Sequence, residues 1–387
     1  MDKVRLGVIG VGNMGSAHIK NYIEGKMPEI EVTAVCDLKQ DRLDWAKEQL
    51  PQVKTFLDST ELMESGEVDA ILVATPHYDH PRLVIESLEK GLHVMSEKPA
   101  GVYTKAVREM NEVASKSDKK FGIMFNQRTN CLYRKAKEIV ASGEYGELRR
   151  VTWIITDWYR TQAYYNSGGW RATWSGEGGG VLLNQCPHQL DLWQWICGMP
   201  EKITAVCHEG KWHDIEVEDD VMIYAQYPNG ATGTFITTTG DYPGTNRLEI
   251  TLEKAKLICE NGKLTLTKLN KGQSEYIVSA EEGFASIEYT TEDVELDGRN
   301  VQHPEVMNKF AAAILRNEDM TANGQEGING LTISNAAFLS SWLGQTVTLP
   351  IDEDLYYEKL QEKIKNSTFK KVVKEQVQGD MSSTYSN

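Results

Sequence analysis

The chain has 387 residues, and its 41 basic and 56 acidic side chains give it a formal charge of −15. At this length two domains are expected, because single hydrophobic cores stop growing at roughly 250 to 300 residues. With 40% hydrophobic and 25% charged residues and a mean hydropathy of −0.43, the composition excludes a disordered or fibrous protein. It is the composition of an ordinary soluble globular protein.

Charge and hydropathy also exclude two classes of partner. The acidic excess repels phosphate backbones and anionic lipids, and no run of five or more Lys or Arg reverses it locally. No apolar stretch reaches the roughly 18 residues of a membrane helix, and Met1–Lys3 leads directly into an apolar run without a signal-peptide pattern. We therefore expect no nucleic-acid partner, no membrane association and a cytoplasmic location.

The cysteines form neither a disulfide framework nor a zinc motif. Six of them are scattered along a long chain, and no two are spaced as C-x-x-C. We expect reduced thiols that pack as small hydrophobes. They are Cys36, Cys131, Cys186, Cys197, Cys207 and Cys259.

The first 125 residues alternate short apolar runs with helix-type spacing, which is typical of repeated βαβ units. The pattern predicts an α/β domain with a doubly wound parallel sheet over residues 1–125. Expected strands are Val4–Ile9, Val32–Cys36, Val68–Ala74, His93–Ser96 and Phe121–Phe125, and expected helices are Ser16–Glu24, Leu43–Leu50, Arg82–Lys90 and Thr104–Ser115.

After Asn126 the pattern changes to longer strands joined by hairpin turns at 228–230 and 261–262. This predicts an α+β domain with a large open, mostly antiparallel sheet over residues 126–370, followed by a polar tail over 371–387. Expected strands are Leu148–Thr156, Asp220–Tyr227, Ala231–Thr237, Leu248–Leu252, Lys256–Cys259 and Lys263–Thr267; expected helices are Tyr133–Ala141, Pro187–Cys197, Glu305–Arg316 and Ile328–Gly344.

A glycine motif stands where the first strand should turn into the first helix. Gly10, Gly12 and Gly15 form G-x-G-x-x-G, and Asp37 ends the second strand 22 positions later. Such glycines permit a tight turn and close backbone approach, and the helix N-terminus faces a pyrophosphate. The motif predicts a dinucleotide site, with the candidate cofactor contacts Gly10, Gly12, Asn13 and Met14.

Asp37 also bears on the choice of cofactor. Its carboxylate should accept hydrogen bonds from the adenosine ribose hydroxyls, and its charge should repel the 2′-phosphate of NADP. NAD is therefore expected over NADP, although Lys39 and Arg42 lie close enough to weaken the preference.

Polar residues follow the next two apolar runs as well. Thr75, His77 and His80 follow one run, and Glu97 and Lys98 follow the next. Ligands bind outside the carboxyl ends of parallel strands, so all five are candidate cofactor contacts. The two histidines could also form an H-x-x-H metal pair, but no further ligand cluster accompanies them, and we predict no metal site.

The combination of motifs resembles the glucose-fructose oxidoreductase, inositol dehydrogenase and MocA (Gfo/Idh/MocA) family. It comprises G-x-G-x-x-G, Ala74-Thr75-Pro76 followed by His80, Glu97-Lys98-Pro99, and a later Gly-Gly-Gly segment followed by His-x-x-Asp. The resemblance implies a Rossmann domain, a C-terminal open-sheet domain that often packs in homodimers or homotetramers, and NAD(P)-dependent chemistry on a sugar or cyclitol hydroxyl.

The same resemblance suggests catalytic residues. Lys98 looks like the family lysine that contacts both cofactor and substrate hydroxyl, where an ammonium stabilises a developing alkoxide. His188 is our candidate general base, since its ordinary pKa suits a proton transfer at neutral pH. Asn184 lies four positions earlier, on the same face if a helix begins there. Many relatives have Asp at this position, and an amide can orient a substrate hydroxyl but is a weak base.

Further candidates are aromatic or polar. Seven Trp and Tyr residues lie between positions 153 and 174; such rings suit stacking against a sugar, with core packing or a subunit interface as alternatives. Trp158 is the candidate substrate contact among them. Arg171 follows Trp170 as in the family pair that approaches the cofactor. Asn126 and Arg128 are candidate cofactor and substrate contacts, with surface placement as the alternative.

The sequence thus predicts an NAD-dependent dehydrogenase acting on a secondary hydroxyl of a sugar, a glycoside (for example at C3) or a cyclitol. Lys98 and His188 are expected to meet over the nicotinamide. Three alternatives stay open: an NAD-dependent glycosidase that works by transient oxidation and elimination, an inositol dehydrogenase proper, and a non-catalytic dinucleotide-binding sensor.

Overall fold

The computed structural model describes residues 2–374, so the end of the expected polar tail, from residue 375 onward, lies outside the described residues. The described chain divides into two compact units. The first comprises residues 2–129, 176–178 and 300–331, and the second comprises 130–175, 179–299 and 332–374. The first unit thus includes a C-terminal segment in addition to the range 1–125 expected for the cofactor domain.

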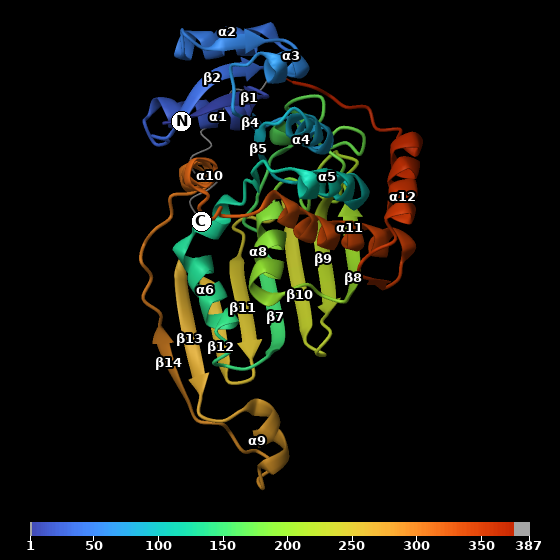
Figure 1. Cartoon of the computed structure of the whole chain (residues 1–387). Coiled ribbons are helices and arrows are strands. Elements are labelled where there is room, and N and C mark those ends of the chain that lie inside the picture. The colour runs from blue at the N-terminus through green and yellow to red at the C-terminus, as the bar shows by residue number, and fades with distance from the viewer. Residues whose placement is uncertain (1, 375–387) are drawn as a thin grey trace. The chain divides into compact units, whose positions relative to one another are not determined.

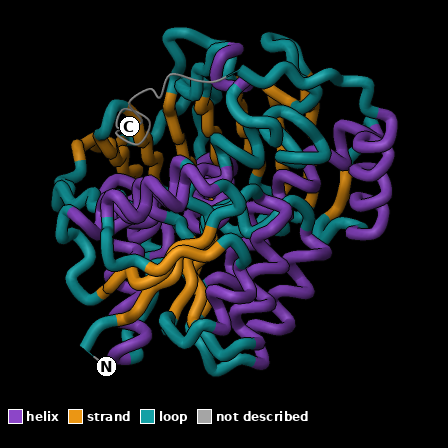
Figure 2. Tube along the Cα trace, turned by 90° about the horizontal axis from the view of Figure 1, so that it is seen from above, coloured by secondary structure: helices purple, strands orange, loops and turns teal. Residues whose placement is uncertain are grey.

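The first unit contains a six-stranded sheet in the order β3-β2-β1-β4-β5-β6, with every neighbouring pair parallel. Chain order reverses at β1, which pairs with both β2 and β4. This confirms the doubly wound sheet, and Figure 2 shows its strands between helices. The strands are β1 Val4–Ile9, β2 Ile30–Cys36, β3 Lys54–Phe56, β4 Ala70–Val73, β5 His93–Ser96 and β6 Phe121–Ile123.

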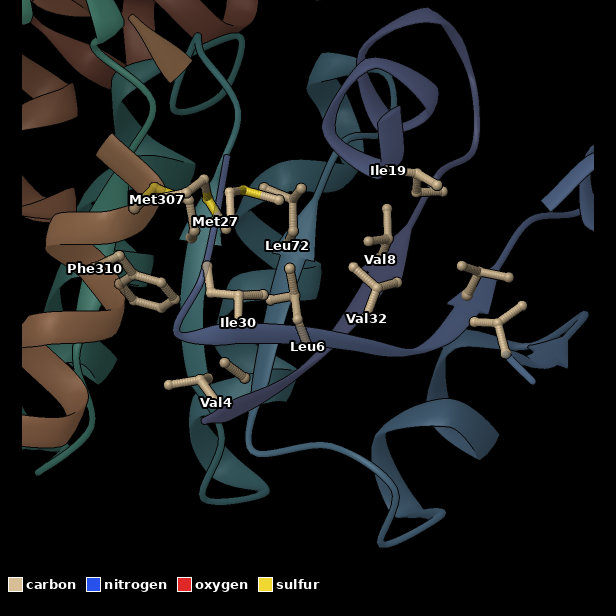
Figure 3. Close-up of a cluster of buried hydrophobic side chains, with 14 of the residues drawn as sticks. Val4, Leu6, Val8, Ile19, Met27, Ile30, Val32, Leu72, Met307 and Phe310 are labelled. Atoms are coloured by element: carbon tan, nitrogen blue, oxygen red, sulfur yellow. The ribbon is translucent and has the colours of Figure 1, made fainter. Parts of the chain in front are cut away.

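One face of the central strand β1 consists of apolar residues, which the helices packed on the parallel sheet cover. Val4, Leu6 and Val8 are fully buried within one hydrophobic cluster (Figure 3). Met307 and Phe310 from the C-terminal helix α10 (His303–Arg316) belong to the same cluster. This packing is why a helix so late in the chain belongs to the first unit.

Three helices of the first unit, α1, α2 and α4, begin two or three residues before the predicted positions, and α5 begins at the predicted residue Thr104. The strand β3, the helix α3 and the 3₁₀ turns were not expected, because each is too short to show a periodicity. The helices are α1 Asn13–Ile23, α2 Gln40–Gln49, α3 Ser59–Glu64, α4 His80–Glu89 and α5 Thr104–Lys116, with the 3₁₀ turns η1 His77–Asp79, η2 Asn126–Thr129 and η3 Gly324–Glu326.

The second unit contains a nine-stranded sheet in the order β14-β13-β12-β11-β7-β10-β9-β8-β15. Its pairs are antiparallel except for β7 with β10. The mostly antiparallel open sheet is therefore confirmed. The strands are β7 Leu148–Ile155, β8 Lys202–Glu209, β9 Glu218–Gln226, β10 Thr232–Thr238, β11 Asn246–Leu252, β12 Ala255–Glu260, β13 Lys263–Leu269, β14 Tyr289–Asp293 and β15 Val347–Thr348.

Helices α6 (Cys131–Ala141) and α8 (Pro187–Cys197) lie over one face of this sheet (Figure 1). Trp193 of α8 stacks on Phe235 of β10, and both side chains are buried. Along β9, buried and exposed residues alternate, as a sheet with one covered face requires. The remaining helices are α7 Gln162–Asn166, α9 Gln273–Ser279, α11 Gly327–Leu343 and α12 Glu353–Asn366.

The cysteines and the hydropathy of the helices bear on two of the expectations from composition. All six cysteines are free thiols, and three of them are buried, in agreement with the predicted packing role. Within residues 2–374 no helix is both long and apolar enough to cross a bilayer. The cytoplasmic location stays a prediction.

Candidate functional site

The glycine turn after β1 has three different local environments. Gly10 adopts a φ of +92°, and a Cβ there would lie 2.6 Å from the Ala74 carbonyl oxygen. A Cβ at Gly15 would lie 1.9 Å from the carbonyl oxygen of Gly10. A Cβ at Gly12 would meet no atom within 4 Å. Two glycines therefore close the turn, and the third leaves open space beside it.

Helix α1 begins directly after Gly12 with no side-chain cap and no acidic residue in its first turn. Its N-terminus is therefore electrostatically suited to an anion. Asn13 is exposed and Met14 is half-buried in this first turn. Open space at Gly12 beside an uncapped helix end fits the pyrophosphate of a dinucleotide.

Asp37 has a second role that its motif spacing does not indicate. Its Oδ2 accepts a hydrogen bond of 2.8 Å from the Val11 amide inside the glycine turn, and its Oδ1 accepts one of 2.9 Å from the Lys39 amide. The side chain is only half-buried, and each carboxylate oxygen can accept more than one hydrogen bond. Asp37 therefore holds the turn and keeps acceptor capacity for ribose hydroxyls.

The carboxyl end of β4 carries the first pair of histidines. The Thr75 hydroxyl is buried without a hydrogen-bond partner among the described residues, which suits a polar ligand atom. His77 Nδ1 lies 3.2 Å from the Glu177 carbonyl oxygen. His80 is fully buried, with Nδ1 2.7 Å from the Pro99 carbonyl oxygen and Nε2 2.8 Å from that of Thr75. His80 thus bridges two loops of the main chain.

Glu97 is buried against a histidine, a contact that sequence reasoning missed. Its Oε1 lies 2.7 Å from His18 Nε2, and the His18 ring meets the His303 ring edge-on at 5.5 Å. Burial alone raises the pKa of the Glu97 carboxyl, but the hydrogen bond to His18 and the neighbouring Lys98 ammonium outweigh it and lower the pKa. Glu97 is therefore ionised at neutral pH.

Lys98 follows β5 and is half-buried. Its amide nitrogen donates to Glu97 Oε2 at 3.3 Å. Strand β5 pairs in parallel with β4, and β4 pairs in parallel with β1. The glycine turn and Lys98 therefore both lie at the carboxyl end of the sheet. Lys98, Thr75 and the turn thus follow neighbouring parallel strands of the first unit.

Asn126 and Arg128 follow β6, and both are buried, so the alternative of surface placement is wrong. Asn126 Nδ2 donates to Gln302, while its Oδ1 has no hydrogen-bond partner among the described residues. Arg128 Nη1 forms an ion pair of 2.7 Å with Glu326. Whether either residue contacts a ligand stays a prediction.

In the second unit, a buried carboxylate anchors the Gly-Gly-Gly segment. Glu218, the first residue of β9, accepts hydrogen bonds from the amides of Gly180 (2.7 Å) and Leu182 (2.9 Å), and it is fully buried. A Cβ at Gly180 would lie 2.0 Å from the Glu218 carbonyl oxygen. The glycine therefore lets the chain approach β9. Nothing in the sequence spacing indicated Glu218, because it lies 38 positions later.

His188 lies at the second position of α8, after Pro187 at the first, where proline is tolerated. The His188 side chain is buried. Asn184 is half-buried in the turn before the helix, with its amide bonded to the Gly180 carbonyl oxygen at 2.9 Å. The expectation that Asn184 and His188 share a helical face is therefore wrong, because the helix begins three residues after Asn184.

Six of the seven aromatic residues fall into two groups, and the seventh, Tyr159, is exposed. The first group consists of core residues of the second unit, as the alternative of core packing predicts: Trp153, Tyr165 and Trp174. The other group stacks with arginines: Arg160 lies over the rings of Trp158 and Tyr164 (5.5 and 5.2 Å), and Arg171 lies over those of Tyr164 and Trp170 (both 4.6 Å).

Tyr164 connects this stack to the segment before α8. Its hydroxyl accepts hydrogen bonds from Arg171 Nη1 (2.7 Å) and Gln185 Nε2 (3.1 Å). The Trp158 indole nitrogen is buried and has no hydrogen-bond partner among the described residues. The predicted ligand contacts of Trp158 and Arg171 stay predictions.

Among residues 2–374, no group of three or more His, Cys, Asp or Glu side chains is placed to hold a metal ion. His77 and His80 lie with ring centroids 6.0 Å apart, and each is bonded to a main-chain carbonyl oxygen. The H-x-x-H spacing thus has a structural explanation.

The sequence matches known families over both units. Residues 4–125 match the "Oxidoreductase family, NAD-binding Rossmann fold", and residues 133–258 match the "GFO/IDH/MocA C-terminal domain". The myo-inositol 2-dehydrogenase of Thermotoga maritima is 29% identical over 280 residues, which cover 70% of this chain and 80% of that protein. A glycosyl hydrolase family 109 protein of Shewanella putrefaciens is 26% identical over 47% of this chain and 42% of its own length.

Solved structures share the whole architecture. The WlbA dehydrogenase of Chromobacterium violaceum, in complex with NADH and UDP-GlcNAcA, has a TM-score of 0.79 at 25% identity, covering 91% of this chain and 97% of its own. A levoglucosan dehydrogenase, in complex with NADH and L-sorbose, has a TM-score of 0.75 at 18% identity, covering 90% and 99%. The chain therefore belongs to the Gfo/Idh/MocA oxidoreductase family and carries its NAD-binding Rossmann domain.

Proposed function

We propose that the protein is an NAD-dependent dehydrogenase that acts on a secondary hydroxyl of a sugar, a glycoside or a cyclitol. The observation that carries the proposal is the carboxyl end of the first sheet. The glycine turn follows β1 there, and Lys98 follows β5, which is separated from β1 by the single strand β4. When bound, NAD supplies the nicotinamide that accepts or returns a hydride. The relatives support this substrate class, since the names of several refer to inositol, levoglucosan or a nucleotide sugar.

Lys98 is proposed to stabilise the substrate oxygen. An ammonium beside the reacting hydroxyl favours the alkoxide character that develops as the C–H bond breaks, and it does so most strongly where water is excluded. The ionised Glu97 next to it balances this charge, so Lys98 can stay cationic at neutral pH.

His188 is proposed as the general base that takes the hydroxyl proton on a ring nitrogen. Its position in the first turn of α8 disfavours an imidazolium before the reaction, because the positive end of the helix dipole lies there. Asn184 is proposed to orient the substrate through its side-chain amide, and Trp158 to stack against the ring of the substrate.

NAD is proposed as the cofactor rather than NADP. The half-buried Asp37 carboxylate, already fixed by the Val11 amide, would face an additional 2′-phosphate with like charge. The other proposed cofactor contacts are Gly10, Gly12, Asn13 and Met14 of the glycine turn, Thr75 and His77 after β4, Glu97 and Lys98 after β5, and Asn126 and Arg171. His80 is not among them, because both of its ring nitrogens face main-chain carbonyl oxygens.

The test is NADH formation, followed at 340 nm, across a panel of glycosides, sugars and inositols. Lys98→Ala and His188→Ala should each lower kcat about 100- to 10,000-fold. The exposed residues Lys116 and His208 provide matched controls, Lys116→Ala and His208→Ala, that should keep full turnover. Unchanged turnover in either catalytic variant rejects the role of that residue.

A second candidate is an NAD-dependent glycosidase, which the similarity to a glycosyl hydrolase family 109 protein favours. Here the same oxidation is followed by elimination of the aglycone, addition of water to the resulting double bond, and reduction of the ketone by the NADH formed first, so no NADH accumulates. Release of nitrophenol from nitrophenyl glycosides at catalytic NAD concentrations, with deuterium uptake from solvent at the carbon beside the oxidised one, would support it. Stoichiometric NADH without aglycone release would reject it.

We also propose that the protein is a homodimer or homotetramer that assembles through its second sheet. The face of that sheet opposite α6 and α8 carries the exposed apolar residues Val206, Met222 and Tyr224, and such patches often mark interfaces. Light scattering after size exclusion should give a mass of two or four times 43.5 kDa. The Met222→Lys variant should have a smaller mass.

A further inference from the structure

The two residues that flank Lys98 are both held by buried histidines of the same unit. On one side, Glu97 Oε1 lies 2.7 Å from His18 Nε2. On the other side, the Pro99 carbonyl oxygen lies 2.7 Å from His80 Nδ1. His18 and His80 are 1% and 0% exposed, whereas Lys98 is only half-buried. The residues before and after Lys98 are thus held in place, while the Lys98 side chain itself is partly exposed.

The first connection continues to Lys98 itself. Glu97 uses one carboxylate oxygen for His18 and the other for the Lys98 amide, at 3.3 Å. His18 lies in α1, the helix that begins at Gly12 of the glycine turn. A buried carboxylate that loses its hydrogen-bond donor must move or take up a proton. Removal of His18 should therefore displace the segment that carries Lys98.

The second connection joins two strand ends. While Nδ1 of His80 faces Pro99, its Nε2 lies 2.8 Å from the Thr75 carbonyl oxygen at the end of β4. A neutral imidazole donates one of these bonds and an imidazolium donates both. The contact to Pro99 fixes the chain just after Lys98, and the contact to Thr75 fixes a different loop.

We propose that His18 and His80 are positioning residues for Lys98, which they hold in place through Glu97 and Pro99. The inference rests on the proposed catalytic role of Lys98. It assigns a function to two histidines that the proposed proton transfer does not use. It also connects the helix at the dinucleotide turn to the residue that acts on the substrate.

The substitutions can separate each contact from general damage. His18→Gln places an amide donor where Nε2 stood, whereas His18→Leu removes the donor. His80→Asn keeps a donor at the Nδ1 position facing Pro99, whereas His80→Gln keeps one at the Nε2 position facing Thr75. His93→Gln is the control, because His93 lies at the opposite end of β5, where its Nδ1 accepts a hydrogen bond of 2.8 Å from the Lys120 amide.

Two readouts are measured on the full-length protein. The first is kcat at saturating NAD and substrate, together with the NADH dissociation constant from fluorescence. The second needs no turnover: the rate at which an amine-reactive ester acylates Lys98, relative to the exposed Lys116, by peptide mass spectrometry. We expect His18→Leu and His80→Gln to lower kcat at least 10-fold and to change the relative labelling rate at least threefold. His18→Gln, His80→Asn and His93→Gln should stay within threefold of the wild type in both.

The outcomes of these measurements either support or overturn the positioning role of His18 and His80. Equal kcat and equal labelling in all variants, with only the melting temperature lowered, overturn it and leave the histidines a purely structural role. Loss of NADH affinity at unchanged kcat also overturns it. If Lys98→Ala retains turnover, the proposed function fails, while the labelling rates still show whether the histidines position Lys98. If His18→Leu does not fold, the pair of His80 variants decides.

Discussion

The two units each contain a glycine-rich turn that a carboxylate holds by its amides, and the two carboxylates differ in exposure. In the first unit the half-buried Asp37 accepts from the Val11 amide. In the second the fully buried Glu218 accepts from the amides of Gly180 and Leu182. A carboxylate that reaches the surface can serve a turn and a ligand, whereas one that is enclosed by its own chain can serve only the turn.

The comparison predicts the largest loss of stability at Glu218. Glu218→Ala leaves two buried amides without their acceptor, which should cost about 2–5 kcal/mol of unfolding free energy. Urea unfolding of the apo protein measures it. Glu260→Ala is the control, since Glu260 forms a partly exposed ion pair with Arg247, whose loss should cost less than about 1 kcal/mol. An unfolding midpoint that Glu218→Ala leaves unchanged would mean that the carboxylate does not hold the turn.

The glycines of the first turn should separate stability from cofactor binding. Gly15→Ala forces a Cβ toward the carbonyl oxygen of Gly10 and should cost about 1–3 kcal/mol of unfolding free energy. Gly12→Ala meets open space, so the apo protein should lose less than about 0.5 kcal/mol. It should nevertheless weaken NADH binding, because the new methyl group occupies the space proposed for the pyrophosphate. Equal effects of both substitutions in urea unfolding and NADH titration would contradict this assignment.

Asp37 should set cofactor choice at little structural cost. Asp37→Asn keeps an oxygen for the Val11 amide but removes the negative charge, so the preference for NAD over NADP should fall about tenfold, equivalent to about 1.4 kcal/mol. The ratio of kcat/KM for the two cofactors measures it. Asp41→Asn, an exposed carboxylate in the next helix, serves as the control. An unchanged ratio would show that Asp37 only holds the turn.

A smaller effect concerns acid stability of the first unit. Burial lowers the pKa of His303 to about 4, so the neutral form is favoured in the folded state. Above the ordinary pKa of about 6.5 the ring is neutral in both states and has no effect on stability; as the pH falls from 6.5 toward 4 only the unfolded chain takes up the proton, so the free energy of unfolding falls. Between pH 7.5 and 5.5 the loss should be about 1 kcal/mol. His303→Asn should flatten the pH dependence of urea unfolding, whereas His208→Asn on the surface should not; equal slopes would refute the assignment.

Much of the first unit could be predicted from the sequence. The strand β1, the glycine turn and Asp37 are close in sequence, and both the apolar run and the motif are local signals. The end of β5 was identified in the same way. The residues that hold these elements were not predictable: His18 contacts Glu97 across 79 positions, and no local pattern marks such a pair.

The second unit was predicted less completely. Its longer strands alternate buried and exposed residues, so their existence was recognised, but β8, β14 and β15 were missed. The start of α8 was correct at Pro187, yet Asn184 was assigned to a helical face that does not exist. Glu218, from a distant strand, holds the turn that precedes the helix.

By itself, the sequence determined the family, most strands and helices of the cofactor unit, and the turn suited to a dinucleotide, because each is marked by residues that are neighbours along the chain. Only the tertiary structure decided which buried partners hold those elements, among them His18, His80 and Glu218. It also decided that α10 completes the core of the first unit. Such contacts form between distant segments when apolar surface is buried and every enclosed polar group must find a partner.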